Sequence, residues 1–273
     1  MEKLNFLTAG IPTRSKDYAS AFVDLREMNL DGLELEFVRG VRISEKSVTS
    51  IKADKKELTL TAHAPFYVNL SSLEKDKQEA SVGRILETAQ VANELGAYSI
   101  TYHAGFYMGR DKKEVFDIIL KKHEEIIEIL EKENNKIWIR PETTGKGTQW
   151  GDVDEIIELS KNFKNVLPCV DFSHLHARYN GIYNTYDEFC EVFEKIGKNL
   201  GDIALKNFHA HIAGIEYGAK GEKHHLNLAE SDFNYKDLLK AFKTFEVCGA
   251  VICESPNIEE DCKLLKEYWL EIQ

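Results

Sequence analysis

The feature that most constrains this chain is a regular alternation of short apolar runs with longer amphipathic stretches. Eight runs have the apolar, β-branched character of strands: Leu4–Ala9, Gly32–Phe37, Leu58–His63, Tyr98–His103, Lys136–Glu142, Val166–Asp171, Asn207–Ile212 and Ala250–Glu254. Each is followed by a segment with helical periodicity: Ser15–Met28, Ser44–Asp54, Ser72–Leu95, Lys112–Glu133, Val153–Lys161, Tyr186–Asn199, Tyr235–Phe245 and Ile258–Glu271. Asp111 and Asp152 stand where two of these helices need an N-cap.

Eight strands that are each followed by a helix predict an α/β fold of the (β/α)8 TIM barrel type. The length of 273 residues suits this fold, which typically needs about 250. An open doubly wound sheet is the alternative, but no glycine-rich phosphate loop follows the first run. Because no linker or low-complexity stretch divides the chain, we expect one barrel domain over residues 1–273.

Composition limits the compartment and the kind of ligand. The five cysteines are an odd number, lie far apart and form no C-x-x-C pair, so a disulfide framework is unexpected and a cytoplasmic location is favoured. The start, MEKLNFLTAG, does not have the pattern of a signal peptide, and no apolar run approaches a membrane span of about 18 residues. We expect a monomer that does not bind membranes.

Most side chains that can bind a metal stand at the carboxyl end of a predicted strand. They are His63, His103, Glu142, Asp171, His211 and Glu254. In a barrel these ends converge on one face, where active sites are built. A single histidine at a strand end usually caps or packs, but placements on six strands together indicate a shared site. Imidazole and carboxylate suit Zn²⁺, Mn²⁺ or Fe²⁺, whereas Ca²⁺ prefers oxygen ligands.

Further candidate ligands lie in the loops just beyond two strands. His174 follows Asp171 in D-F-S-H, a spacing that lets one turn supply two ligands. Glu222, His224 and His225 occur in GEKHHLNL, after the seventh predicted strand. The whole set exceeds the four to six positions of one ion, so two or three metals are implied.

Two other histidines are interpreted without a ligand role. His123 lies within the Lys- and Glu-rich helical segment LKKHEEIIEIL, and we expect it to be solvated. His209 shares a strand face with His211 but lies two residues deeper, so we expect it to support the site or pack in the core.

In chain order, the motifs resemble the endonuclease IV family, the AP endonucleases of the xylose isomerase-like TIM-barrel superfamily. The motifs that carry the resemblance are HAPFYVNL at His63, YHAGFY at His103, PETTGKGTQWG at Glu142, CVDFSH at Asp171 and His174, HIAG at His211 and ESPN at Glu254. They run from the third to the eighth predicted strand.

The resemblance implies a cluster of three metal ions, usually zinc. Glu142 would bridge two ions and be the catalytic residue, with His63 and His103 on the first ion. Asp171, His211 and Glu254 would complete the second. His174 would bind the third, together with an acid and a histidine from the loop after strand seven. Glu36, in LELEF, would be a supporting or core residue.

In that loop the sequence departs from the family pattern of D-x-H. Matching on E-x-H selects Glu222 and His224. Matching on H-x-x-L selects His225 instead and leaves Lys223 where the acid should be. Leu228 and Glu230 fit the second register, so we prefer His225, with Glu222 as the carboxylate.

The activity implied by the resemblance is hydrolysis of the phosphodiester 5′ to an abasic site, a step in DNA repair. The formal net charge of −11 would repel DNA at long range, but bound cations reverse the sign locally. Phe66 and Tyr67 are candidates for contacts with bases, and Lys146 and Arg178 for contacts with the DNA backbone.

Two other classes of function fit part of the pattern. A sugar or sugar-phosphate isomerase or epimerase of the same superfamily would use Glu142, Asp171, His211 and Glu254 with one or two metals. The additional histidines exceed what such a site requires and favour the nuclease. A metal-binding protein without catalytic activity would instead have closed coordination.

Overall fold

The computed structural model describes residues 2–273, and its central element is a sheet of eight parallel strands. Neighbouring strands follow the order β6-β4-β3-β2-β1-β12-β9-β8. Their bounds are β1 Leu4–Ala9, β2 Gly32–Glu36, β3 Thr59–His63, β4 Ser99–Tyr102, β6 Trp138–Pro141, β8 Val170–Asp171, β9 Phe208–Ile212 and β12 Gly249–Cys253. Two antiparallel pairs lie outside this sheet: β5 Gly105–Phe106 with β7 Gln149–Trp150, and β10 Gly214–Gly218 with β11 Gly221–Leu226.

The sheet closes between β6 and the segment that leads into β8. Parallel bridges join Ile139 to Val166 and Glu142 to Cys169. The regular part of β8 is shorter than the predicted strand Val166–Asp171 because Pro168 has no N–H to donate to its neighbour. The ring of parallel strands confirms the predicted TIM barrel.

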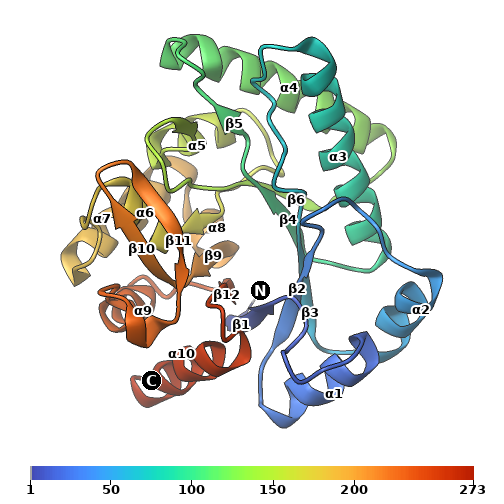
Figure 1. Ribbon diagram of the computed structural model, residues 1–273, viewed down its shortest axis with the longest axis vertical. Helices are drawn as coiled ribbons and strands as arrows, with labels where there is room; N and C mark the ends of the chain where they lie inside the picture. Colours follow the sequence, from blue (N-terminus) through green and yellow to red (C-terminus); the bar gives the residue numbers. More distant parts are fainter. Residues whose placement is uncertain (1) are drawn as a thin grey trace.

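Helices surround the strands (Figure 1). Their bounds are α1 Tyr18–Glu27, α2 Glu45–Asp54, α3 Lys75–Glu94, α4 Lys112–Lys132, α5 Val153–Ser160, α6 Phe172–Arg178, α7 Tyr186–Leu200, α8 Asp202–Lys206, α9 Tyr235–Thr244 and α10 Glu259–Glu271, with a 3-10 turn at Leu228–Glu230. The predicted caps are present, since the Asp111 and Asp152 side chains accept hydrogen bonds from the backbone N–H groups of Lys113 and Asp154. The sequence did not predict α6, α8 or the β10–β11 hairpin.

The hydrophobic core lies mainly between the strands and the helices, while the barrel interior is polar. Glu34, Thr61, Thr101, Arg140 and His209 point inward by strand alternation and are fully buried. Buried polar groups need partners, so this interior must be held together by specific contacts.

Near the amino-terminal end of the barrel, other protein groups supply most of those contacts, although Arg140 Nε has no hydrogen-bond partner. The Asp31 carboxylate lies 2.7 Å from Lys3 Nζ and 2.8 Å from Lys266 Nζ, and it also accepts a hydrogen bond from the Phe6 N–H. The buried Arg140 guanidinium donates to the carbonyl oxygens of Pro168 and Asn207. Each buried charge here meets opposite charge or hydrogen-bond acceptors.

The expectation that His123 is solvated was wrong. Its side chain is fully buried between α4 and β4, where Nδ1 donates to the Ile119 carbonyl and Nε2 accepts from the Tyr102 hydroxyl. Burial lowers the pKa of His123 to about 4, so the ring is neutral. The charged neighbours concealed a helical apolar stripe in which His123 follows Val115 and Ile119 at four-residue spacing.

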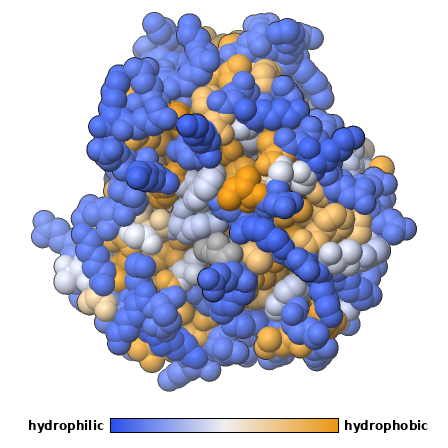
Figure 2. All heavy atoms as spheres, turned by 180° about the vertical axis from the view of Figure 1, so that it is seen from behind, coloured by the Kyte–Doolittle hydropathy of each residue, from blue (hydrophilic) through white to orange (hydrophobic). Residues whose placement is uncertain are grey.

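The face turned away from the viewer in Figure 1 is covered mainly by hydrophilic side chains, with smaller apolar areas between them (Figure 2). Within residues 2–273, no helix combines the length and apolar character needed to cross a membrane.

Candidate metal centre at the barrel mouth

The candidate ligands at the strand ends converge on three overlapping groups. Within each group, the possible ligand atoms all lie within 4.8 Å of one another. The groups are His63, His103 and Glu142; Glu142, Asp171, His211 and Glu254; and Asp171, His174 and His225. Because Glu142 and Asp171 each belong to two groups, the three groups form one continuous cluster.

Glu142 is the centre of this cluster. Its side chain is 1% exposed and is approached by imidazole nitrogens from four elements. Oε2 lies 3.1 Å from His63 Nε2, while Oε1 lies 3.2 Å from His103 Nε2, 3.3 Å from His174 Nδ1 and 3.4 Å from His211 Nδ1. A carboxylate with both oxygens turned to different histidines is arranged to be shared between two ions.

The start of α6 brings two of the ligands together. Asp171 ends β8 and is also the N-cap of α6, where Oδ1 accepts a 2.7 Å hydrogen bond from the His174 N–H. The other oxygen, Oδ2, faces His174 Nδ1 at 3.1 Å. The three-residue spacing in D-F-S-H therefore places both side chains on the first turn of the helix.

Three buried atoms in the largest group have no hydrogen-bond partner. They are Glu142 Oε1, Asp171 Oδ2 and His211 Nδ1. Buried polar atoms are nearly always bonded, and an unpaired one costs about 1–3 kcal/mol. All three belong to candidate ligands, and each can bind a cation through a lone pair. The donor set therefore fits a metal centre.

Charges in the cluster are strongly coupled. Burial opposes ionisation of Glu142, but the charges of His103 and His211 outweigh it and lower its pKa. Burial likewise opposes the charge of His63, yet contact with Glu142 raises the pKa of His63 to about 10. Burial raises the pKa of Asp171. A proton on His63 thus balances the Glu142 carboxylate, and a metal that binds to His63 must displace that proton.

A β-bulge in the β10–β11 hairpin decides which loop residues face the cluster. Tyr217 pairs with Glu222, but the preceding residue, Glu216, pairs with His224, so Lys223 is an extra residue in β11. The bulge allows Glu222 and His225, three positions apart, to face the barrel.

The distances from the two side chains to His174 agree with this bulged register. His225 Nε2 lies 3.4 Å from His174 Nε2, and Glu222 Oε2 lies 3.7 Å from the same atom. The His224 side chain is 59% exposed and faces Glu216 instead. The structure brings Glu222 and His225 to His174 and turns His224 away from it.

A family model described as xylose isomerase-like TIM barrel matches residues 22–268. The chain belongs to this family. An uncharacterized protein of Methanocaldococcus jannaschii is 44% identical over 269 residues, 98% of each chain. A probable endonuclease 4 of a Sulfurihydrogenibium species is 27% identical over 177 residues, 63% of this chain and 62% of that relative.

Two solved structures whose names indicate different activities resemble the chain with the same TM-score. A D-tagatose 3-epimerase-like protein superposes with a TM-score of 0.75 and 22% identity, covering 97% of this chain and 98% of its own. Endonuclease IV from Thermus thermophilus also gives 0.75, with 17% identity over 99% of this chain and 100% of its own. At these identities the likeness shows the fold alone, so function must be argued from the site.

Two exposed aromatic residues follow β3, next to His63. Phe66 is 62% exposed and Tyr67 is 41% exposed, with their rings in an edge-to-face arrangement at 5.3 Å. The Arg84 guanidinium lies 4.5 Å from the centre of the Tyr67 ring. An exposed pair of aromatic rings beside a polar site is suited to contact with a planar or apolar ligand group.

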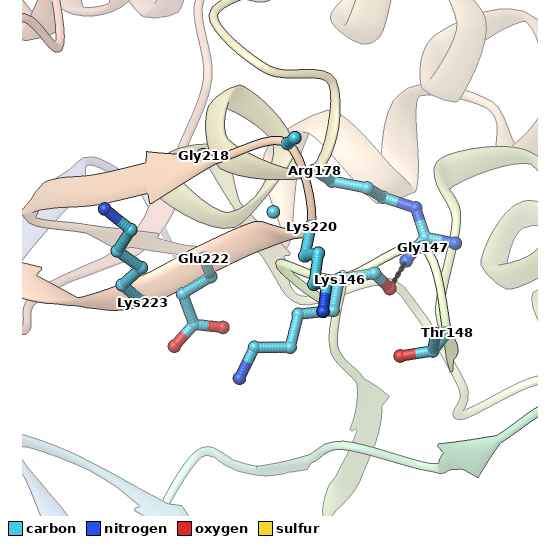
Figure 3. A pocket seen from close by; sticks show the side chains of 10 residues that line it. Lys146, Gly147, Thr148, Arg178, Gly218, Lys220, Glu222 and Lys223 are labelled. Atoms are coloured by element: carbon cyan, nitrogen blue, oxygen red, sulfur yellow. Dashed lines mark hydrogen bonds between the residues drawn. The ribbon is translucent and has the colours of Figure 1, made fainter.

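A cavity of about 930 Å³ lies between the hairpin and the 146–148 segment (Figure 3). Its charged lining side chains are Lys146, Arg178, Lys220, Glu222 and Lys223. Lys223 is paired with Glu216 at 2.7 Å, but neither Lys146 nor Lys220 has an ion-pair partner within the described part of the chain. The cavity therefore offers two free ammonium groups beside a candidate metal ligand.

Glycines allow the hairpin to come this close. A Cβ on Gly221, whose φ is 90°, would lie 2.2 Å from the Gly145 carbonyl oxygen. The Glu222 N–H donates to that oxygen at 2.9 Å. A side chain at Gly221 would push the hairpin away and move Glu222 with it.

Arg178 lines the cavity and also holds one of its loops. Its side chain is 5% exposed, and Nη1 donates to the carbonyl oxygens of Lys146 and Gln149. Arg178 therefore fixes the loop that carries Lys146, and its assignment to substrate binding stays a prediction.

Of the two acids of β2, the sequence identified Glu36 only as a supporting or core residue and did not identify Glu34. Glu34 is fully buried beneath the cluster, next to His209 and His211, and was not singled out in the sequence. Glu36 is half-buried at the mouth, where burial raises its pKa to about 8. The alternation in L-E-L-E was the available signal, because it turns both acids inward.

Proposed function

We propose that this protein is a metal-dependent AP endonuclease that hydrolyses the phosphodiester 5′ to abasic sites in DNA, with two or three ions per chain. Zn²⁺ is the first candidate, with Mn²⁺ or Fe²⁺ as alternatives. The observation that carries the proposal is the size of the cluster: three overlapping ligand groups are joined through Glu142 and Asp171. A sugar epimerase needs only one or two ions.

The ligands divide among three positions. His63, His103 and Glu142 would hold the first ion. Glu142, Asp171, His211 and Glu254 would hold the second. His174, His225 and Glu222 would hold the third. Bound ions would polarise phosphoryl oxygens and make a water molecule nucleophilic near neutral pH.

The protein's own residues would hold and orient the DNA. Glu142 would be the ligand shared by the first two ions, and it is the proposed catalytic residue. Phe66 and Tyr67 are exposed for contact with the bases around an extruded abasic nucleotide. Lys146 and Lys220 supply positive charge that an acidic protein needs where it meets a phosphate backbone. The endonuclease 4 relative provides independent support.

A sugar epimerase is the second candidate, favoured by one observation. The group formed by Glu142, Asp171, His211 and Glu254 would by itself suffice for a single-ion epimerase site. The likeness to the epimerase-like structure is as close as that to the endonuclease. An epimerase would have no use for His174, His225 and Glu222.

The test uses the zinc-loaded full-length protein and a duplex with one tetrahydrofuran abasic analogue. We expect a single nick 5′ to the analogue that leaves a 3′-hydroxyl, and complete loss of nicking in the presence of a chelator. The same duplex without the analogue is the control. Failure to nick at any metal loading, together with epimerisation of a ketose, would establish the alternative.

A further inference from the structure

Beneath the proposed metal centre lies a carboxylate that has no ligand role. Glu34, on β2, is fully buried, neither of its oxygens has a hydrogen-bond partner, and two imidazoles lie beside it. Oε1 lies 3.1 Å from His211 Nε2, and Oε2 lies 3.3 Å from His209 Nε2. A buried carboxylate is stable only when donors face it, so both ring nitrogens must present N–H groups.

The ring chemistry then fixes the state of His211. A neutral imidazole has one N–H and one lone pair. With the proton on Nε2, facing Glu34, the lone pair is on Nδ1. That atom lies 3.2 Å from Glu254 Oε1 and 3.4 Å from Glu142 Oε1, within the largest ligand group. The proton on Nε2 thus faces the carboxylate, and the lone pair on Nδ1 faces the ligand group, as metal binding through Nδ1 requires.

His209 is fixed in the same way. Its Nδ1 lies 2.9 Å from the hydroxyl oxygen of Ser99, which is also fully buried. If the hydroxyl donates to Nδ1, the ring proton is on Nε2 and points to Glu34. The opposite tautomer would turn a lone pair toward the Glu34 carboxylate. The two Nε2 atoms also lie 3.2 Å from each other. With both of them protonated, the Glu34 carboxylate offers each N–H its own acceptor oxygen.

We propose that Glu34 is a positioning residue that, supported by His209 and Ser99, holds His211 with its proton on Nε2 and so presents the Nδ1 lone pair to the metal. The proposal rests on the metal centre of the proposed function but not on its substrate. Carboxylates that orient a metal-binding histidine in this way raise its basicity and restrict its rotation.

A separate ion beneath the centre is the competing explanation. Cys169, His209 and His211 have possible ligand atoms within 4.8 Å of one another. An ion there would use Nε2 of His211 while Nδ1 binds the main centre, so His211 would have to lose both ring protons. Neutral imidazole retains one proton, which favours the positioning role.

The first measurement needs no variant. Protein labelled with ¹⁵N-histidine is loaded with ¹¹³Cd²⁺, and one-bond couplings identify the nitrogen that binds the ion. We expect the coupling of His211 through Nδ1, with Nε2 protonated. Coupling through Nε2, or a fourth ion bound per chain, would overturn the proposal.

The second measurement compares zinc affinities by competition with a chromophoric chelator. Glu34→Gln replaces one acceptor oxygen with a donor, and we expect the affinity of one ion per chain, the ion held by His211, to fall roughly 10- to 100-fold. Ser99→Ala should have a smaller effect, below about tenfold. Asp31→Asn neutralises a buried acid just before the same strand, next to Lys3 and Lys266, and should leave the affinity unchanged.

The outcomes separate this proposal from the proposed function. Wild-type zinc affinity in folded Glu34→Gln would refute the positioning role alone. A chain that binds no divalent metal would refute both the metal centre and the positioning role. If Glu34→Gln does not fold, the ¹¹³Cd coupling and Ser99→Ala decide the question.

Discussion

The two ends of the barrel bury charge in opposite ways. At the amino-terminal end, Asp31 contacts two lysines and a backbone N–H, and Arg140 donates to two carbonyl oxygens, with only its Nε unpartnered. At the mouth, Glu142, Asp171 and His211 each keep a buried atom without a hydrogen-bond partner, and all three belong to one group of possible metal ligands. Charged groups at the lower end are thus paired mainly within the protein and serve the fold, whereas the unpartnered atoms at the mouth converge where a cation would satisfy them.

This contrast predicts a separation of effects. Substitutions at the lower end should reduce stability and leave metal content unchanged. Substitutions at the mouth should reduce metal content and activity, with a smaller effect on stability. Four experiments test or refine this separation.

The largest effect is expected from Glu142→Gln. Loss of the shared carboxylate should remove at least one ion per chain and reduce nicking of abasic DNA by about 10³-fold or more. Plasma emission spectrometry and a gel-based nicking assay measure the two quantities, and circular dichroism confirms the fold. Activity within about tenfold of the wild type would refute the central role of Glu142.

At the amino-terminal end of the barrel, Asp31→Asn should lower the free energy of unfolding by about 2–4 kcal/mol, because Lys266 is left largely buried without its partner. Urea denaturation measures the loss. Ion content per chain should equal that of the wild type. A fall in ion content would show that the two ends are not independent.

The hairpin provides a matched pair of adjacent histidines. His225→Ala should weaken binding of the third ion and reduce activity roughly 10- to 100-fold, since His225 faces His174. His224→Ala should stay within about twofold, because its side chain is exposed and faces Glu216. Equal effects of the two substitutions would contradict the bulged register.

The smallest effect is expected from substitution of the two unpaired lysines that line the cavity. Lys146→Gln and Lys220→Gln should raise KM for abasic DNA by about 3- to 10-fold with little change in kcat, and more so at low salt. Lys198, exposed at the end of α7, gives a control substitution with the same charge change. An effect of Lys198→Gln as large as that of Lys146→Gln would indicate general electrostatics rather than the cavity.

The sequence predicted well the parts of the molecule that follow strand periodicity. Each expected strand is present, and the strand-end ligands meet because parallel strands place their carboxyl ends on one face. The position of His225 also followed from the residues downstream of it. These features depend on the local pattern of residues, and a single sequence is enough to show that pattern.

Features that depend on tertiary contacts were missed. His123 seemed solvated because its neighbours are charged, although its spacing from Ile119 put it on the apolar face. The partners of Arg178 are backbone carbonyls of a distant loop, and no sequence pattern reveals this contact. The role of Glu34 depends on His209 and His211, which are far away in the chain and adjacent only across the closed barrel.

The extra residue at Lys223 has a consequence for detecting such sites in other chains. A strand normally reverses the direction of every later side chain when one residue is inserted, yet here the insertion is absorbed locally. A search that demands fixed ligand spacing would not detect the proposed third site of this chain. Search patterns for this kind of enzyme should therefore accept both two- and three-residue steps between the acid and the histidine.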